Sequence, residues 1–567
     1  MAKKPLEEGG IHRAKLWEIA LYACNNTSTN AYMMLVSSIS YFLVGIVGVG
    51  VVLAGSLMTI MRIWDGVTDP FVGMFVDNTN TKFGKNRPFI LIGQIIMIIG
   101  TLLMFNIIPR INPSFRFIVF IIIYMIYIVG YTAQCVVTKS AQSCLTNDPE
   151  QRPMFAIFDG VYMVVFMSVW YPIYLSGTLI PNFTLVSADP TQAARISELV
   201  AQNPALQNVL QTQEGTTILS GFYNPDMWSH MQFVFAMISF VLAILAIIGL
   251  WRKDNSKYFG TGKVQRVSFR DYADVLAHNR GIQMLVVAAS SDKLSMNCMS
   301  NSTVTVCLYG IIFGNYALSG SLSAITSIPM LLFTIFGIGT IARKLGQKAC
   351  LVVGTWGAML SAAVLAFMIY VGHDKSFLLP AFSLTNPATW GSLADGANWS
   401  LFAVLFMIVY VLMRGFAQLS SNIVIPMTAD CADYEVYRTG KYVPGLMGTL
   451  FSFVDKLISS LASTIVALLF STIGFVSALP DQSTPFSNGI LIVTLICFIG
   501  MPMIGWILNV VAMKFYPLTK EKMAEIQDDI ARIKAQAMMS DVNSEVTAQM
   551  EVVMEETDNP VIGGGEF

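Results

Sequence analysis

Two carboxylates stand four residues apart in a stretch that otherwise has the composition of a membrane helix, from Arg62 to Pro70. An α-helix has about 3.6 residues per turn, so Asp65 and Asp69 project from one face, with Arg62 one turn before Asp65. Ionised side chains are costly in hydrocarbon, and these are expected to face protein or water and to have partners. The pattern predicts an ion or substrate pathway. An interhelical salt bridge with a purely structural role is the alternative.

Polar stripes at helical spacing also occur in the second half of the chain. Their members are four and eight residues apart: Lys293, Asn297 and Asn301 in one stripe, and Arg414, Gln418 and Asn422 in the other. Such stripes are expected to face a substrate path between helix bundles. Two inward-facing cations favour an anionic substrate. The alternative is that they only neutralise intramembrane acids, for which the candidates are Asp159, Asp292 and Asp455.

The elements that carry these residues are predicted to be membrane helices. Of the residues, 54% are hydrophobic and only 12% are charged, about half the charged share of a typical soluble protein. Runs of about 20 apolar residues can span a bilayer. Twelve such runs are present, roughly at 15–45, 49–76, 87–109, 115–141, 153–181, 227–251, 281–314, 320–342, 348–371, 398–426, 443–475 and 488–515.

Loop charges predict the orientation of these spans. Lys and Arg cluster in alternate loops, above all in the basic segment 252–280. By the positive-inside rule both termini are then cytoplasmic, and the protein is expected to be a multi-pass cell-membrane protein, in the inner membrane if it is bacterial. The predicted domains are a six-helix bundle at 14–251, a cytoplasmic linker at 252–280, a second six-helix bundle at 281–516 and a cytoplasmic tail at 517–567.

An insertion at 181–226 is predicted to form a partly helical cap on the outer side, or else a surface insertion without function. Eight cysteines without a CxxC pair predict neither disulfides nor a zinc site. The absence of a GxxxxGK[ST] motif leaves direct coupling to ATP unsupported.

Two separate blocks carry a resemblance to a known family. The first runs from Arg62 to Pro70 and continues through Lys82-Phe-Gly-Lys-Asn-Arg87-Pro88. The second comprises residues 429–441, Gly445 and the segment 451–456, which ends in Asp455-Lys456. Together they resemble the signatures of the glycoside-pentoside-hexuronide:cation symporters, the melibiose-permease-type branch of the major facilitator superfamily.

The resemblance implies an all-α membrane protein of the major-facilitator fold, with twelve transmembrane helices in two six-helix bundles. It also implies that Asp65 and Asp69 coordinate a coupling Na⁺, Li⁺ or H⁺, acting as metal ligands if the ion is Na⁺. Lys456 is then expected near that site, with Arg62, as a coupling residue. Elementary physics agrees, because two close carboxylates repel each other and a bound cation relieves the repulsion.

The residues expected to bind substrate depart from the family pattern. Sugar-specific members have one acid in the first helix and another in the fourth, whereas the nearest positions in this chain are Asn30 and the pair Gln134–Cys135, all neutral. Asn26 is a further candidate to bind substrate. Amides still form hydrogen bonds with hydroxyl groups. The family places the fourth-helix acid near the cation, so its loss implies weaker coordination of Na⁺ or coupling to H⁺ instead. Tyr32 and Trp170 are candidates to contact a sugar ring, the alternative being interfacial anchors.

The sequence therefore predicts a secondary active transporter that symports a glycoside, pentoside or hexuronide with Na⁺ or H⁺ by alternating access. It predicts a monomer in the lipid bilayer, with no enzymatic activity, no nucleic-acid partner and no cofactor besides the coupling ion. The alternatives are an amphiphile or lysolipid carrier of the same superfamily, a membrane-embedded enzyme, or a receptor.

Overall fold

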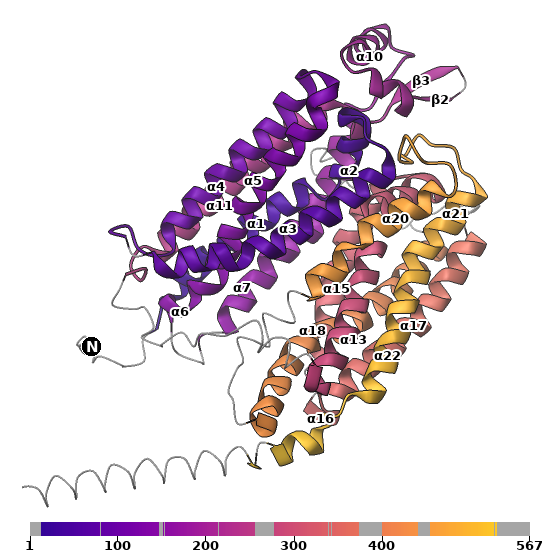
Figure 1. Cartoon of the computed structure of the whole chain (residues 1–567). Helices are drawn as coiled ribbons and strands as arrows, with labels where there is room; N and C mark the ends of the chain where they lie inside the picture. The colour runs from indigo at the N-terminus through magenta and orange to yellow at the C-terminus, as the bar shows by residue number, and fades with distance from the viewer. Residues whose placement is uncertain are drawn as a thin grey trace, which may run out of the picture.

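The computed structural model describes residues 13–79, 81–146, 151, 153–213, 215–255, 277–337, 340–341, 343–372, 400–439, 454–526 and 528–529. Within these ranges the chain is helical apart from turns and one small sheet. The helices form two groups, one from each half of the chain, which lie side by side (Figure 1). Most of the linker 252–280, the motif residues 440–453 and the tail after residue 529 lie outside the described residues.

The first group contains six helical segments, several of which are divided by short π- or 3₁₀-helical turns. In chain order the elements are α1 Leu16–Leu35, α2 Ile39–Phe42, η1 Leu43–Val47, α3 Val51–Asn78, α4 Arg87–Leu102, η2 Leu103–Ile107, η3 Ile108–Arg110, α5 Pro113–Ser140, α6 Gln142–Leu145, α7 Pro153–Met163, η4 Val164–Trp170, α8 Tyr171–Tyr174, η5 Leu175–Leu179, α9 Ile180–Phe183 and α11 Pro225–Leu250. Its helices pack closely where glycines face each other. A Cβ atom on Gly93 of α4 would lie 2.7 Å from the carbonyl oxygen of Gly130 in α5.

The second group repeats this plan. Its elements are α13 Arg280–Met299, α14 Ser302–Thr305, η9 Val306–Ile312, α15 Ala317–Gly337, α16 Arg343–Leu345, α17 Gln347–Gly372, α18 Leu401–Thr439, α20 Ala462–Ser471, α21 Asn488–Leu495, η13 Ile496–Gly500 and α22 Met501–Phe515. A helical span from Val454 to Ser471 contains α20. In this group α17 packs on α18 and α13 packs on α22.

In the described ranges, ten helices are long and apolar enough to cross a membrane, or eleven if one bent pair counts as a span. That pair, Ser302–Ile312 and Ala317–Phe333, is bent by 110°. The expected seventh span is broken into α13, α14 and η9, and α13 is less apolar than the other long helices because its side chains include Asp292 and Lys293. With this broken segment and α15 counted separately, the described chain has twelve helical segments, as predicted.

The insertion between α9 and α11 is a small folded unit at one end of the molecule (Figure 1). It contains β1 Leu185–Val186, α10 Pro190–Gln202, η6 Pro204–Val209, β2 Gln211–Gln213, β3 Thr216–Leu219 and η7 Gly221–Tyr223. The antiparallel sheet has the order β1-β3-β2 and pairs Leu185 with Leu219 and Thr212 with Thr217. The Asp189 side chain accepts from the Thr191 N–H at 2.8 Å and so caps α10. The expected helix in the insertion is thus confirmed.

The two halves meet near the end that carries the insertion. There α3 packs on α20, and α15 packs on α8 and η4. A Cβ atom on Gly55 of α3 would lie 2.6 Å from the backbone oxygen of Ser463, so glycine permits the close approach. The Thr59 hydroxyl donates to the carbonyl of Ser460 at 2.8 Å, and the Ser323 hydroxyl of α15 donates to the carbonyl of Ser168 at 2.7 Å.

A loop of the second half adds to this contact. We call residues 476–483, which lie between α20 and α21, the strap. First-half groups bind five of its residues: Val51 N–H donates to the carbonyl of Val476 (2.9 Å), Tyr223 Oη donates to the carbonyl of Leu479 (2.7 Å), Tyr41 Oη donates to the carbonyl of Pro480 (2.8 Å), Thr184 Oγ1 accepts from Gln482 (3.3 Å), and the Gln213 amide donates to the carbonyl of Ser483. The insertion supplies three of these residues, Thr184, Gln213 and Tyr223, and so helps to hold the halves together at this end.

Candidate functional site

The acid pair of α3 lies against a lysine of the other half. Lys456 forms an ion pair with Asp69, and its Nζ also lies 3.4 Å from Oδ2 of Asp65. Arg62 Nη1 lies 3.6 Å from the same Asp65 oxygen. Helical spacing places the two acids on one face, and the contact between α3 and α20 brings the lysine to them. One ammonium group therefore contacts two carboxylates across the boundary between the halves, and Arg62 supplies the second positive charge.

The two acids differ in their surroundings. The Asp65 side chain is only 5% exposed, and its Oδ1 accepts a hydrogen bond from the Thr132 hydroxyl at 3.1 Å. The Asp69 side chain is 36% exposed and that of Lys456 is 28% exposed. A buried carboxylate beside a more accessible one offers several oxygen ligands to a small cation, and either can instead hold a proton. Thr132 is a residue that the sequence analysis missed, since a lone threonine in an apolar span gives no signal.

A second ion pair adjoins the first. Lys293 of α13 pairs with Asp455, the chain neighbour of Lys456. The Asp455 side chain is 7% exposed, whereas that of Lys293 is 54% exposed. The charges of Arg62, Lys456 and Lys293 equal in number those of Asp65, Asp69 and Asp455, so this network is neutral overall. Lys293 therefore has the structural partner that the counter-charge alternative required.

Arg414 has a different environment. Its Nη1 lies 3.7 Å from the sulfur of Met296 and 3.9 Å from that of Met299, both in α13, and its Nε is buried without a hydrogen-bond partner. No carboxylate of the described residues lies within 4.0 Å of its guanidinium group. Asp292 is near enough to interact with its charge. The Asp292 oxygens, however, accept from the Ser421 hydroxyl and from Nε1 of Trp506, the latter at 3.0 Å.

The other members of the two stripes are amides that differ in their exposure and bonding. Asn297 is exposed and donates to the carbonyl of Ser459 at 3.3 Å. Gln418 is half-buried and Asn422 is exposed, one and two turns along α18 from Arg414. Exposed amides near the middle of apolar helices are unusual, since hydrocarbon does not satisfy them. Asn301 lies beyond the end of α13 and caps α14, its Oδ1 accepting from the Thr303 N–H at 3.0 Å, so it does not continue the stripe of Lys293 and Asn297 on one helix.

The candidate substrate residues of the first half divide into two groups. Gln134 and Tyr32 are fully buried: the Gln134 amide donates to Oε1 of Gln94 at 3.0 Å, and the Gln94 amide donates to Oη of Tyr32 at 3.3 Å. In this conformation neither presents surface to a ligand, and both tie helices together. Asn26 and Asn30 are half-buried, and the Asn30 amide donates to Oδ1 of Asn26 at 3.0 Å.

Trp170, the remaining candidate, lies in an aromatic stack. Its ring stacks on Phe166 at 5.0 Å and on Tyr174 at 4.9 Å between centroids. The side chain is half-buried, so part of its surface stays accessible. Asp159 of α7, which the sequence offered only as a counter-charge, is also half-buried, and its Oδ1 has no hydrogen-bond partner. This leaves Asp159 unpaired with either Lys293 or Arg414.

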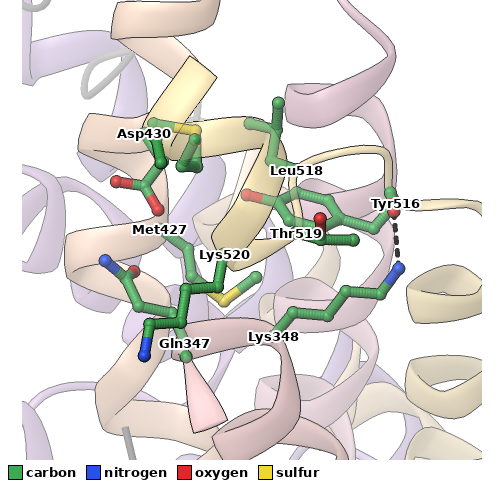
Figure 2. A pocket seen from close by; sticks show the side chains of 11 residues that line it. Gln347, Lys348, Met427, Asp430, Tyr516, Leu518, Thr519 and Lys520 are labelled. Carbon is green, nitrogen blue, oxygen red and sulfur yellow. Dashed lines mark hydrogen bonds between the residues drawn. The ribbon is translucent and has the colours of Figure 1, made fainter. Parts of the chain in front are cut away.

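A separate cavity of about 360 Å³ lies in the second half (Figure 2). Several of its lining residues follow α16 and α22, whose ends lie opposite the insertion in Figure 1. Figure 2 shows Asp430, Gln347 and Lys520 around one side of it, and Lys348 donating to the carbonyl of Tyr516 at 2.7 Å on the other. Asp430 lies beyond the apolar part of α18, and burial, together with the nearby charge of Asp433, raises its pKa to about 6. None of the ion-pair residues lines this cavity.

Sequence comparisons agree with this architecture. A family profile described as "MFS/sugar transport protein" matches residues 21–520. The chain is 23% identical over 529 residues to the uncharacterized symporter YnaJ of Bacillus subtilis, covering 90% of this chain and 94% of YnaJ. It is 23% identical over 514 residues to a glucuronide carrier protein homolog of Escherichia coli, covering 89% and 93% of the two chains. It is 20% identical over 503 residues to the isoprimeverose transporter of Lactiplantibacillus pentosus, covering 88% of each.

Solved structures support the fold alone, because their sequence identities are low. The nucleoside transporter NupG superimposes with a TM-score of 0.54 at 11% identity, covering 89% of this chain and all of NupG. A bacterial homolog of the human lysosomal transporter Spinster, in an inward-facing and unoccupied conformation, gives a TM-score of 0.51 at 11% identity and covers 88% and 96% of the two chains.

Proposed function

The chain belongs to the MFS/sugar transport protein family, and from that premise we propose that it symports a glycoside, pentoside or hexuronide with a monovalent cation by alternating access. Its relatives include a symporter, a glucuronide carrier homolog and an isoprimeverose transporter. The family and these relatives are transporters, so the chain is a transporter rather than an enzyme. The protein works as a monomer in the cell membrane, the inner membrane in a bacterium, with both termini in the cytoplasm.

The observation that carries the proposal is the position of Lys456 between Asp65 and Asp69. Two carboxylates facing Arg62 and Lys456 make a site of zero net charge. An added Na⁺, Li⁺ or H⁺ therefore competes with Lys456 for the same oxygens. Since Lys456 belongs to the other half, occupation of the acid pair by a cation weakens a contact between the halves.

This competition couples the ion to the conformational change. A ligand shifts a two-state equilibrium only by its difference in affinity between the states. Here the cation binds best where Lys456 has moved away from Asp69, and the substrate binds between the halves. By linkage, each ligand then strengthens or weakens the other by the same factor.

The conformation of the structure has one side closed. The hydrogen bonds and ion pairs found between described residues of the two halves lie between the strap and the Lys456–Asp69 pair. With the termini inside the cell, the insertion lies outside. The structure then corresponds to an outside-closed state, in which the ion pair replaces the cation.

A ligand screen on the purified protein tests the proposal. Apparent melting temperatures are measured with a panel of glycosides, pentosides and hexuronides, each in NaCl, LiCl or choline chloride at two pH values. We expect at least one sugar to stabilise the protein more in the presence of one particular ion. The variants Asp65→Asn and Asp69→Asn should still melt cooperatively, but they should lose the part of the stabilisation by sugar that depends on the ion.

The control is Asp189→Asn, which removes an exposed carboxylate while Asn remains a good helix cap. It should behave as the wild type. Ion-dependent stabilisation that survives in both acid-pair variants would overturn the assignment of Asp65 and Asp69.

A further inference from the structure

We propose that Arg414 is an anion-binding residue of the substrate site and that the preferred substrate is a sugar carrying a carboxylate. The inference rests on the proposed function and narrows its substrate class. Its starting point is a contrast between Arg414 and the other intramembrane cations. Lys456 has Asp69, and Lys293 has Asp455. Within the described chain, the guanidinium group of Arg414 contacts two thioether sulfurs and no oxygen anion.

Thioether sulfur is a poor partner for a guanidinium group, since it is at best a weak acceptor. The Nε atom of Arg414 is buried and lacks even that. A planar guanidinium group has five N–H donors arranged to match a carboxylate. The guanidinium group of Arg414 is thus able to bind an anion with two oxygen atoms, such as a carboxylate.

Arg116 shows how this protein satisfies an arginine that has a structural role. Arg116 is 2% exposed, and all three of its nitrogens donate to backbone carbonyls: Nε to Ile111 at 3.0 Å, Nη1 to Ile46 at 2.9 Å and Nη2 to Pro109 at 2.8 Å. No such set of acceptors surrounds Arg414 in the described structure. The difference indicates that Arg414 is kept for a ligand rather than for the fold.

The nearest alternative partner is Asp292. Its two oxygens are held by Ser421 and Trp506, and neither lies within 4.0 Å of the guanidinium group. Asp292 therefore acts on Arg414 only at a distance. It lowers the cost of placing a cation there without using its donors.

The surroundings of Arg414 suit a sugar acid. One turn before it on α18, Tyr410 is half-buried and stacks on Phe406 at 6.2 Å. One turn after it, Gln418 offers an amide that can bind hydroxyl groups. An aromatic ring, a guanidinium group and an amide on one helix face match the apolar face, the carboxylate and the hydroxyls of a hexuronide.

The experiment compares matched pairs of ligands on the purified protein in the presence of the effective cation. Glucuronate and galacturonate, and their methyl glycosides, are measured against glucose, galactose and the corresponding neutral methyl glycosides. The wild type should bind a uronide at least 10-fold more tightly than its neutral counterpart. Arg414→Gln should weaken that uronide about 30-fold or more and change the neutral ligand less than threefold.

Two further variants make the result decisive. Arg414→Lys keeps the charge but loses the planar fork, so it should retain part of the preference for the uronide. Arg116→Gln, the matched control, should lower the melting temperature and leave the ratio of uronide to neutral affinity unchanged. If Arg414→Gln does not fold, the wild type and Arg414→Lys still give the ratio.

Cation-dependent binding of neutral sugars as tight as that of uronides, in the wild type, would overturn this inference and leave the symport proposal intact. Equal loss of neutral and anionic ligands in a folded Arg414→Gln would do the same. Absence of any cation-dependent sugar binding would instead contradict the proposed function itself.

Discussion

Lys456 lies in an environment that favours its positive charge only while the acid pair is negative. It is 28% exposed and touches both Asp65 and Asp69, so a cation at either acid removes part of what stabilises it. Removing one partner of a buried ion pair typically costs about 3–5 kcal/mol, because the other charge is left uncompensated. The partial exposure here reduces that figure. The coupling should therefore be measurable without unfolding the protein.

Replacing Lys456 with Val should uncouple ion from substrate. Without Lys456 and without a bound cation, the carboxylates of Asp65 and Asp69 repel each other, so the pair should bind the cation more tightly. The bound cation should, however, no longer raise the affinity for the substrate. In a double-mutant cycle of Lys456→Val with Asp69→Asn, we expect an interaction free energy of about 0.5–3 kcal/mol for cation binding. Strictly additive effects would show that the two residues do not interact.

The grouping of site residues on one helical face could be predicted from the helical spacing in the sequence, but their partners on other helices could not. Spacing alone placed Asp65 with Asp69 and Arg414 with Gln418, because the helical period fixes which side chains share a face. It did not distinguish Lys293, which has Asp455 as a partner, from Arg414, which has no carboxylate partner among the described residues, since that depends on distances between helices. Tyr32 and Gln134 also lie in the buried packing, which a helical pattern does not distinguish from a ligand-facing position.

At the scale of elements, the end of α18 carries the Asp430 carboxyl group, whose charged form is less favourable in the folded protein than in the unfolded chain. Burial is the main cause of the raised pKa of Asp430, the charge of Asp433 adds to it, and a hydrogen bond from Gln347 opposes it. The pKa of about 6 lies above the ordinary value of 3.8. The folded state thus binds the proton more tightly than the unfolded chain does. The contribution of Asp430 protonation to the stability of the fold is complete below the pKa of the unfolded chain, 3.8, and is lost as the pH rises through about 6.

Asp430→Asn should therefore raise the apparent melting temperature at pH 7.5 and change it little at pH 4.5. Between those values the wild type should gain stability on acidification, and the variant should gain less. Melting curves across this pH range check the prediction, with the exposed Asp528→Asn as a control. Parallel pH profiles for wild type and Asp430→Asn would refute the assigned protonation.

The architecture of the helices was more predictable than their irregularities. Apolar runs and the two motif blocks gave the major-facilitator fold, because membrane-spanning length is fixed by the bilayer. The break of the seventh span into α13, α14 and η9 was not predicted. It falls at Ser300 and Asn301, where the Asn301 side chain caps α14, and one capping residue inside a long span gives no hydropathy signal. The insertion was predicted as a cap with a helix, but loop sequences carry no signal for the strap that it contacts.

At the scale of the whole molecule, the strap stabilises the closed conformation on the insertion side through hydrogen bonds between the two halves. Its bonds to Val51, Tyr41, Tyr223 and Gln213 all join opposite halves. At about 0.5–1.5 kcal/mol each, they add up to several kcal/mol that must be lost before this side opens. The upper part of that range is enough to shift a two-state equilibrium between its extremes, for which about 5.5 kcal/mol is needed.

Removing the hydroxyls of Tyr41 and Tyr223 together should open the insertion side more often. An added cysteine at Ala467, which is buried against Gly55 of the other half, reports this through a membrane-impermeant maleimide applied from that side. The two hydroxyls make three bonds, because Tyr223 Oη also accepts from the Leu479 N–H at 3.1 Å. Losing three bonds of the stated strength should speed labelling about 10-fold or more. The parent without the added cysteine gives the background rate.

Tyr171→Phe is the matched control for this experiment. Tyr171 is also a buried tyrosine, but its hydroxyl bonds to Ser37 and to the carbonyl of Met34, both in its own half. It should lower stability without speeding the labelling. Equal labelling in the double Tyr41→Phe, Tyr223→Phe variant and in the wild type would contradict a role for the strap in closure.

The most direct test of cation-coupled symport is accumulation of a substrate in proteoliposomes that contain only this protein. We expect the wild type to concentrate the substrate above its outside level when an inward gradient of Na⁺, Li⁺ or H⁺ is imposed, and to equilibrate it otherwise. Asp65→Asn should equilibrate or exchange the substrate but never concentrate it. Accumulation without any of these gradients, or undiminished accumulation by Asp65→Asn, would contradict the account.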